Sequence, residues 1–122
     1  MSDDDLRLNV LETGDRLVVA EVVGELDMST ATAFYVRATA LLDDHPDQIL
    51  DLSGVTFCDS SGFNAVLRLR RRVEETGGWF ALAAPPLQIG RLLTLTGAET
   101  VFAVYDTRDE AVAAHPGDNT PS

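Results

Sequence analysis

The sequence predicts an α/β domain with a mostly parallel β-sheet, an N-terminal antiparallel hairpin and about four covering α-helices. Two observations predict this class. After the first two strand-like segments, apolar runs with strand character alternate with amphipathic helical segments, which is typical of a parallel sheet with helical cover. The 122 residues, 45% of them hydrophobic, are also enough for one buried core and too few for two.

The start of the chain predicts the hairpin. Residues 6–12 place apolar side chains at every second position, and residues 16–24 are rich in valine. Between them, the TGD sequence at 13–15 supplies the Gly and Asp that tight turns favour. We expect this hairpin to form one edge of the sheet.

A helix and a central strand follow. Residues 29–44 carry apolar side chains at helical spacing, with Ser29 or Thr30 as the expected N-cap and Pro46 as the stop. Residues 48–55 are short and dominated by branched apolar side chains, which indicates a central strand covered by helices.

The second half of the chain repeats the alternation of helix and strand. We expect a helix at 60–76, a strand at 79–84, a helix at 87–97, a buried strand at 101–105 and a helix at 107–115. Gly77 and Gly78 end the first of these helices, and Thr107 caps the last. The domain is predicted to span 6–115, between a flexible acidic N-terminus at 1–5 and a disordered tail at 116–122.

Charge and composition restrict the partners. The formal net charge is −11, and all nine basic residues are arginine. Phosphate backbones and anionic membranes repel such a chain, so we expect no nucleic acid and no membrane partner, and we favour protein partners. The lone Cys58 cannot form an internal disulfide, the N-terminus lacks signal-peptide character and no apolar run is long enough to span a membrane. A cytoplasmic protein, with Cys58 as a small buried side chain, is the expectation.

No enzyme motif stands out. Glu25, Asp27 and Asp51 lie among apolar strand residues without a second acidic cluster. His45 and His115 each stand beside a proline at the end of a helix, where a solvated or C-capping imidazole is the simplest interpretation. Nucleotide-binding glycine loops and nucleophile elbows are absent from the sequence. We therefore predict no metal, no cofactor and no catalytic residue.

The arginine cluster RLRRR at 68–72 is also interpreted first as a structural feature and not as a binding site. The neighbouring Glu74 and Glu75 and the acidity of the chain favour a solvated, salt-bridged helix face. A contact with an anion or an acidic partner stays open as the alternative.

The DSSG sequence, in which Asp59, Ser60 and Ser61 join a buried strand to a helix, lies where open α/β sheets expose functional groups. Asp or Ser in this turn would cap the helix, which is worth about 1 kcal/mol. A phosphoserine here would also suit the positive end of the helix dipole, so phosphorylation would change the surface without melting the fold. A partner that had buried the hydroxyl would then have to desolvate a dianion.

Three segments together resemble one family. GELDMSTA at 24–31, ILDLSGVTFCDSSGF at 49–63 and the segment 77–112 are similar to the STAS domain, and within it to bacterial anti-sigma factor antagonists (anti-anti-sigma factors) of sporulation and the general stress response. The resemblance extends from about residue 6 to residue 114 in the order and spacing of the family.

This resemblance implies a partner-switching regulator of transcription. In the family, the unphosphorylated antagonist binds an anti-sigma factor that is also an ATP-dependent serine kinase, and so releases a sigma factor. Phosphorylation by that kinase ends the complex, and a serine phosphatase restores it. The acceptor carries over to Ser60, with Ser61 as runner-up, so the chain is expected to be a phosphoprotein and a kinase substrate with no enzyme activity of its own.

The resemblance also implies a partner-binding surface in which the GELD loop lies beside the acceptor. Its expected members are Glu25, Asp27, Asp59, Ser60, Ser61, Gly62, Asn64 and Arg68. Many relatives have glycine where this chain has Asn64, which bears on which partner binds. Two alternatives stay open: a STAS scaffold or accessory subunit of a stress-sensing assembly or transporter, and, ranked last, a domain that binds a small ligand itself.

Overall fold

The computed structural model describes residues 5–117 and shows a five-stranded sheet with the strand order β1-β2-β3-β4-β5. Its strands are β1 (Leu6–Thr13), β2 (Leu17–Leu26), β3 (Asp47–Cys58), β4 (Phe80–Ala83) and β5 (Ala103–Tyr105). β1 pairs with β2 antiparallel, and the other pairs are parallel. The predicted fold class, with its hairpin at one edge and β3 in the centre, is confirmed.

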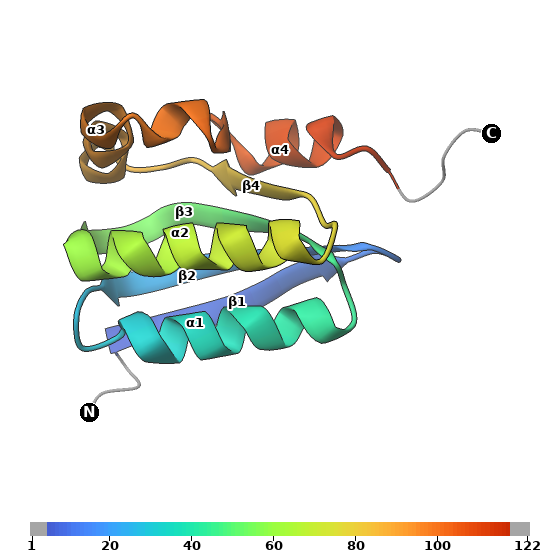
Figure 1. Cartoon of the computed structure of the whole chain (residues 1–122), viewed down its shortest axis with the longest axis horizontal. Coiled ribbons are helices and arrows are strands. Elements are labelled where there is room, and N and C mark those ends of the chain that lie inside the picture. Colours follow the sequence, from blue (N-terminus) through green and yellow to red (C-terminus); the bar gives the residue numbers. More distant parts are fainter. Residues whose placement is uncertain (1–4, 118–122) are drawn as a thin grey trace.

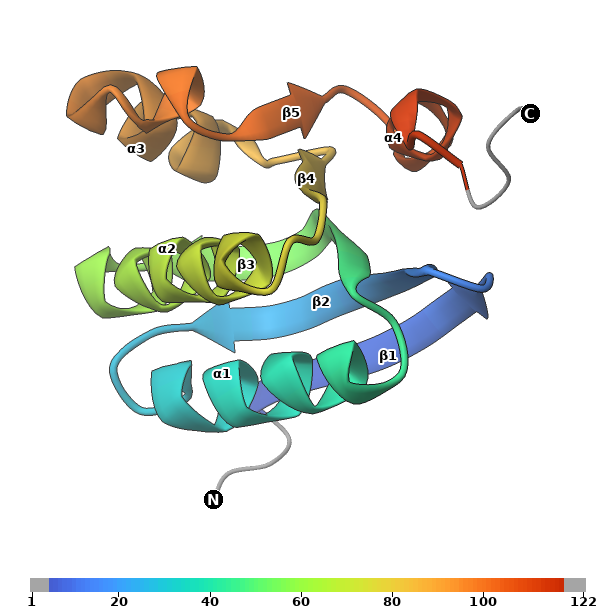
Figure 2. The ribbon, with the colours of Figure 1, turned by 45° about the vertical axis from the view of Figure 1, so that its right-hand side comes forward.

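Helices cover both faces of the sheet because its strands bury alternate side chains on opposite sides. The helices are α1 (Ala31–Ala40), α2 (Ser60–Glu75), α3 (Leu87–Thr96) and α4 (Arg108–Ala114). The larger core includes Phe34 of α1, Leu69 of α2 and Leu50 of β3. A smaller core on the other face joins Ile49 of β3 to Ala111 of α4. α1 and α2 lie side by side along the sheet (Figure 1), whereas α3 and α4 lie near its β4–β5 edge (Figure 2).

Several boundaries differ from the sequence prediction. The helix expected at 29–44 is α-helical only to Ala40 and continues as a 3-10 turn, η2 (Leu41–Asp43). β3 extends to Cys58, three residues beyond the expected strand, because its far end continues to pair with β2. β5 is half-buried where a buried strand was expected, because it is an edge strand with one neighbour. It follows a second 3-10 turn, η3 (Ala98–Thr100).

The caps of the other helices follow the prediction more closely. α2 ends at the two glycines, where the N–H groups of Gly77 and Gly78 bond the carbonyls of Glu74 and Val73 at 3.0 and 2.9 Å. The Thr107 hydroxyl accepts a 3.0 Å hydrogen bond from the Glu110 N–H, which confirms the predicted cap of α4. The flexible N-terminus was predicted for residues 1–5 and the disordered tail for residues 116–122. Of these, residues 1–4 and 118–122 lie outside the described residues.

Candidate functional site

The turn after β2 is closed by its own side chains. The Thr30 hydroxyl donates to the Glu25 carbonyl at 2.8 Å and accepts from the Asp27 N–H at 2.9 Å. One oxygen of Asp27 accepts from both the N–H and the hydroxyl of Ser29, at 2.9 and 2.8 Å. The Ser29 hydroxyl is the main reason that the pKa of Asp27 lies below its usual value. The carboxylate of Asp27 is therefore ionised and held in place by the loop.

These contacts correct the expected N-cap of α1. Thr30 does occupy the N-cap position, but its side chain makes no capping hydrogen bond. Its hydroxyl instead closes the preceding turn, because Thr30 is buried and its backbone is not extended as that of most N-cap residues is. The residue therefore shapes the GELD loop and does not cap α1.

The turn after β3 is capped by an aspartate. Asp59 is the N-cap of α2, and its Oδ1 accepts the Gly62 N–H at 2.9 Å. The hydroxyls of Ser60 and Ser61 make no hydrogen bond with any residue in the range 5–117, so of the two residue types expected to cap this helix it is the aspartate that does so. The carboxylate reaches the third amide of the helix because the backbone of Asp59 is extended.

Asp59 also joins the two turns. Its Oδ2 accepts the N–H of Met28 at 3.2 Å, and its own N–H donates to the Leu26 carbonyl at 3.2 Å. The two turns meet because β2 and β3 are parallel, with Leu26 beside Cys58 in the register. A Cβ at Gly62 would lie only 2.0 Å from the Leu26 carbonyl oxygen. Gly62 therefore allows α2 to begin directly against the end of β2.

The two candidate acceptor serines differ in accessibility. Ser60 is exposed, whereas Ser61 is half-buried. Ser60 stands at the first position of α2, directly after the carboxylate of Asp59. An exposed hydroxyl without an intramolecular partner is available to another protein, and Ser60 fits this description better than Ser61.

The remaining members of the predicted surface continue along α2 and around the GELD loop. Glu25, Asn64 and Arg68 are exposed, whereas Gly62 is buried and contributes close packing. Ser60 and Asn64 also border an open, mainly apolar pocket of about 320 Å³ beside the turn between α3 and η3. The structure thus brings seven of the eight predicted residues to the GELD loop and the start of α2, at one end of the sheet, whereas Arg68 lies at the middle of α2.

Cys58 lies beneath this site as the last residue of β3. It is buried at 3% exposure, as expected. Burial, and then the negative charge of Asp59, raise the pKa of its thiol to about 11. The protonated thiol behaves as a packing group.

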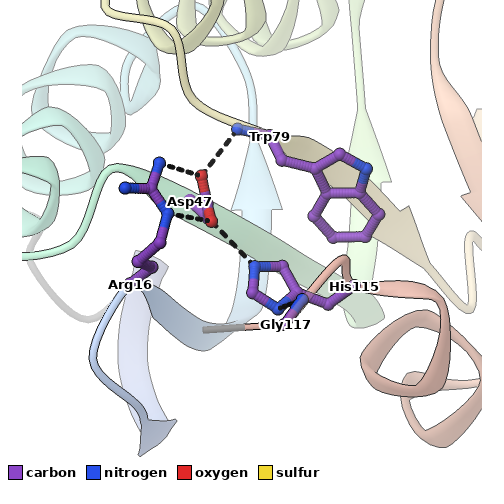
Figure 3. Close-up of polar contacts among 5 residues, drawn as sticks. All are labelled: Arg16, Asp47, Trp79, His115 and Gly117. Carbon is purple, nitrogen blue, oxygen red and sulfur yellow. Dashed lines mark hydrogen bonds and ion pairs between the residues drawn. The ribbon is translucent and has the colours of Figure 1, made fainter. Parts of the chain in front are cut away.

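A buried polar cluster at the other end of β3 was missed (Figure 3). Asp47 accepts hydrogen bonds from the Trp79 N–H at 2.8 Å, from Arg16 Nε at 3.2 Å and from His115 Nε2 at 2.8 Å. His115 Nδ1 accepts the Gly117 N–H at 3.1 Å, so we assign the proton to Nε2. His115 is the C-cap residue of α4, as its place at the helix end suggested, but its imidazole is not solvated and does not cap the helix, because the side chain is 6% exposed and bonds Asp47.

This Asp47 cluster is a structural junction. It ties the β1–β2 hairpin, the start of β4 and the end of α4 to β3. Sequence reasoning had no local signal for it, because Asp47 and His115 are 68 positions apart. Within residues 5–117, no group of three or more His, Cys, Asp or Glu side chains is placed to hold a metal ion.

Fold and site together define the class: an α/β domain with two joined strand-end turns that present an exposed serine. The chain belongs to the STAS domain family, whose model matches residues 9–111. It is 33% identical, over 100 residues, to a Thermotoga maritima protein provisionally described as an anti-sigma factor antagonist, with 80% of this chain and 88% of that protein covered. The predicted family is confirmed.

Solved structures agree with this family. The crystal structure of an anti-sigma factor antagonist from Mycobacterium paratuberculosis has a TM-score of 0.81 and 31% identity, and the match covers 95% of this chain and 98% of that one. The phosphorylated form of Bacillus SpoIIAA has a TM-score of 0.70 over 88% of this chain and 97% of its own; at 21% identity it shows the fold alone. No helix within residues 5–117 is long and apolar enough to cross a membrane.

Proposed function

We propose that this protein is an anti-sigma factor antagonist controlled by phosphorylation of Ser60. In the unphosphorylated state it binds an anti-sigma factor that is also a serine kinase, and a sigma factor is released. Phosphorylation of Ser60 by that kinase ends the complex, and a serine phosphatase restores it. The protein is then a binding protein and a kinase substrate, while ATP is bound by its partner.

The observation that carries this proposal is the position of Ser60. Its side chain is exposed at the start of α2 and makes no hydrogen bond with any residue the structure describes. The Met28 N–H, directly after the GELD loop, donates to Asp59, which joins that loop to the turn that carries Ser60. Of two relatives above 30% identity, one is described as an anti-sigma factor antagonist and the other provisionally so, and a protein of the same fold has been solved in a phosphorylated form.

The local charges explain how phosphate would act as a switch. A phosphoserine adds about −1.5 to −2 charges at neutral pH. The N-terminus of α2 would stabilise this charge, so the domain stays folded. The Asp59 carboxylate adjoins Ser60, and the ionised Asp27 lies in the neighbouring turn, so any partner group beside Ser60 would face a strongly negative surface. We expect binding to weaken by several kcal/mol, about 3–5 as for an unpaired buried charge.

The proposed contact surface has two kinds of members. Glu25, Ser60, Asn64 and Arg68 are exposed and available for direct contact. The others, Asp27, Asp59, Ser61 and Gly62, are half-buried or buried and set the shape of the two turns.

The test is phosphorylation by the cognate anti-sigma kinase with ATP, with the modified residue mapped by mass spectrometry. Ser60 is the expected site, and modification at Ser61 or elsewhere would contradict the proposal. Ser60→Ala should still bind the anti-sigma kinase, and ATP should not end that complex. Ser60→Asp should bind the kinase at least about 100-fold more weakly than the unmodified protein does.

A matched control separates position from charge. Ser53 is an exposed serine on β3, so Ser53→Asp adds the same charge outside the proposed surface. Ser53→Asp should leave partner binding within about twofold. Equal weakening by Ser53→Asp and Ser60→Asp would contradict a local switch, and a protein that binds no anti-sigma kinase at all would favour the scaffold interpretation.

A further inference from the structure

The two helices that lie side by side on one face of the sheet carry a charge opposite to that of the protein. α1 and α2 contain five of the nine arginines but only two of the twenty acidic residues, Glu74 and Glu75. α1 itself contains no carboxylate. The helical layer is therefore basic within a chain of net charge −11.

The arginines of α2 are not equivalent, which the sequence did not indicate. Arg70 is neutralised within the fold: it forms a 2.9 Å ion pair with Glu74 and donates to the Val101 carbonyl at 2.9 Å. The side chains of Arg71 and Arg72 are exposed and form no ion pair or hydrogen bond with any residue in the range 5–117. Of the predicted solvated, salt-bridged helix face, the ion pair is therefore found at Arg70, whereas Arg71 and Arg72 are solvated but form no ion pair.

Arg68 connects the unpaired arginines to α1. Its guanidinium carbon lies 4.3 Å from the centroid of the Tyr35 ring, a cation–π contact that restrains the side chain without neutralising its charge. Tyr35, Arg68, Arg71, Arg72 and Glu75 line a shallow open pocket of about 150 Å³, which we call the arginine face. Three guanidinium groups thus share one surface with a single carboxylate.

We propose that the arginine face docks a short acidic segment of the protein partner. Guanidinium groups bind carboxylates in a two-pronged geometry that lysine cannot reproduce, and every basic residue of this chain is arginine. The net charge of −11 repels extended polyanions such as DNA and anionic membranes over long range. A short segment with a few carboxylates is attracted by the nearby guanidinium groups, and because it carries few charges, the rest of the protein repels it less than it repels a long polyanion.

The arginine face continues the proposed switch surface. Ser60, Asn64, Arg68 and Arg71 follow one another at spacings of four, four and three residues, so they lie along one side of α2. The identity of the partner as the anti-sigma kinase rests on the proposed function, whereas the charge of its docking segment rests on α1 and α2 alone. A partner that contacts Ser60 would reach Arg71 and Arg72 by extending along α2.

The first experiment uses a peptide probe, so it does not depend on the kinase. The ¹⁵N-labelled full chain is titrated with blocked hexaglutamate, and with blocked hexaglutamine as a neutral control, at an ionic strength of about 20 mM. Saturable shifts of the backbone and side-chain resonances of Arg68, Arg71 and Arg72 are expected with hexaglutamate only. Shifts centred elsewhere, or equal shifts with hexaglutamine, would overturn the proposal.

Matched double variants separate the arginine face from net charge. Arg71→Gln/Arg72→Gln should weaken hexaglutamate binding at least about fivefold, whereas Arg7→Gln/Arg91→Gln, which removes the same charge from exposed arginines elsewhere, should change it less than about twofold. Equal losses would mean that only net charge matters and would overturn the proposal.

The same titration distinguishes other occupants of the face. If the resonances of the arginine face shift with protein concentration in the absence of peptide, the face binds a second copy of the chain. Tighter binding to a DNA duplex or to phosphatidylglycerol vesicles than to hexaglutamate would assign it to a polyanion, and either result would overturn the proposal. A kinase that leaves Ser60 unmodified would defeat the proposed function and leave the peptide results unchanged.

Discussion

Replacing Gly62 by alanine tests whether the close contact between α2 and β2 positions the proposed acceptor. A Cβ at residue 62 would lie 2.0 Å from the Leu26 carbonyl oxygen and 2.8 Å from Leu26 Cγ. Cβ atoms essentially never approach non-bonded heavy atoms closer than 3.0 Å, and the Leu26 carbonyl, at the end of β2, is held in place by the 3.2 Å hydrogen bond from the Asp59 N–H. The first turn of α2, which carries Ser60, must therefore move outward by about 1 Å.

Three contributions, one of them stabilising, decide the magnitude. Alanine is favoured over glycine inside a helix by about 1 kcal/mol. Overpacking at a tight contact costs about 1–3 kcal/mol. The shift also disturbs the 2.9 Å bond from the residue 62 N–H to Asp59, a cap worth about 1 kcal/mol. The sum predicts a net destabilisation of about 1–3 kcal/mol.

Urea unfolding measures this change against a control in the same chain. Gly90 lies inside α3, and a Cβ built there meets no atom within 4 Å. Gly90→Ala should therefore raise the free energy of unfolding by about 0.5–1 kcal/mol. If Gly62→Ala also stabilised the protein, the steric reasoning would be refuted. Faster or slower phosphorylation of Ser60 in the folded Gly62→Ala variant would further show that the contact positions the acceptor.

Three more predictions concern other parts of the fold. Burial opposes ionisation of Asp47, but the bonds from His115, the Trp79 N–H and Arg16 outweigh it and hold its pKa below the ordinary 3.8; this stability is present above pH 3.8 and lost as pH falls through the lower folded value. Asp47→Asn should cost about 2 kcal/mol in urea unfolding at pH 7, and a deficit that did not shrink below pH 4 would contradict the charge argument. Thr107→Ala should cost about 1 kcal/mol, seen as faster amide exchange in α4, and unchanged exchange would contradict the cap. Cys58, with its buried thiol and raised pKa, should react with a thiol reagent at pH 8 only in urea, and rapid labelling of the native protein would contradict its burial.

The alternation of strands and helices was predictable from the sequence because it depends on local patterns. Side chains with a period near two or near 3.6 bury one face of an element whatever the rest of the chain does. The GELD and DSSG sequences were likewise recognisable, and their apposition followed from the family resemblance.

The tertiary structure alone decided which polar groups pair when they are distant in the sequence. Asp59 caps α2 and reaches Met28, 31 positions earlier, because two parallel strands end together. His115 is buried against Asp47, and of the neighbouring arginines Arg70 is neutralised while Arg71 is not. Hydrogen bonds and ion pairs require donor and acceptor within about 3 Å, a condition that residues distant in sequence meet only after the sheet and its helices have assembled.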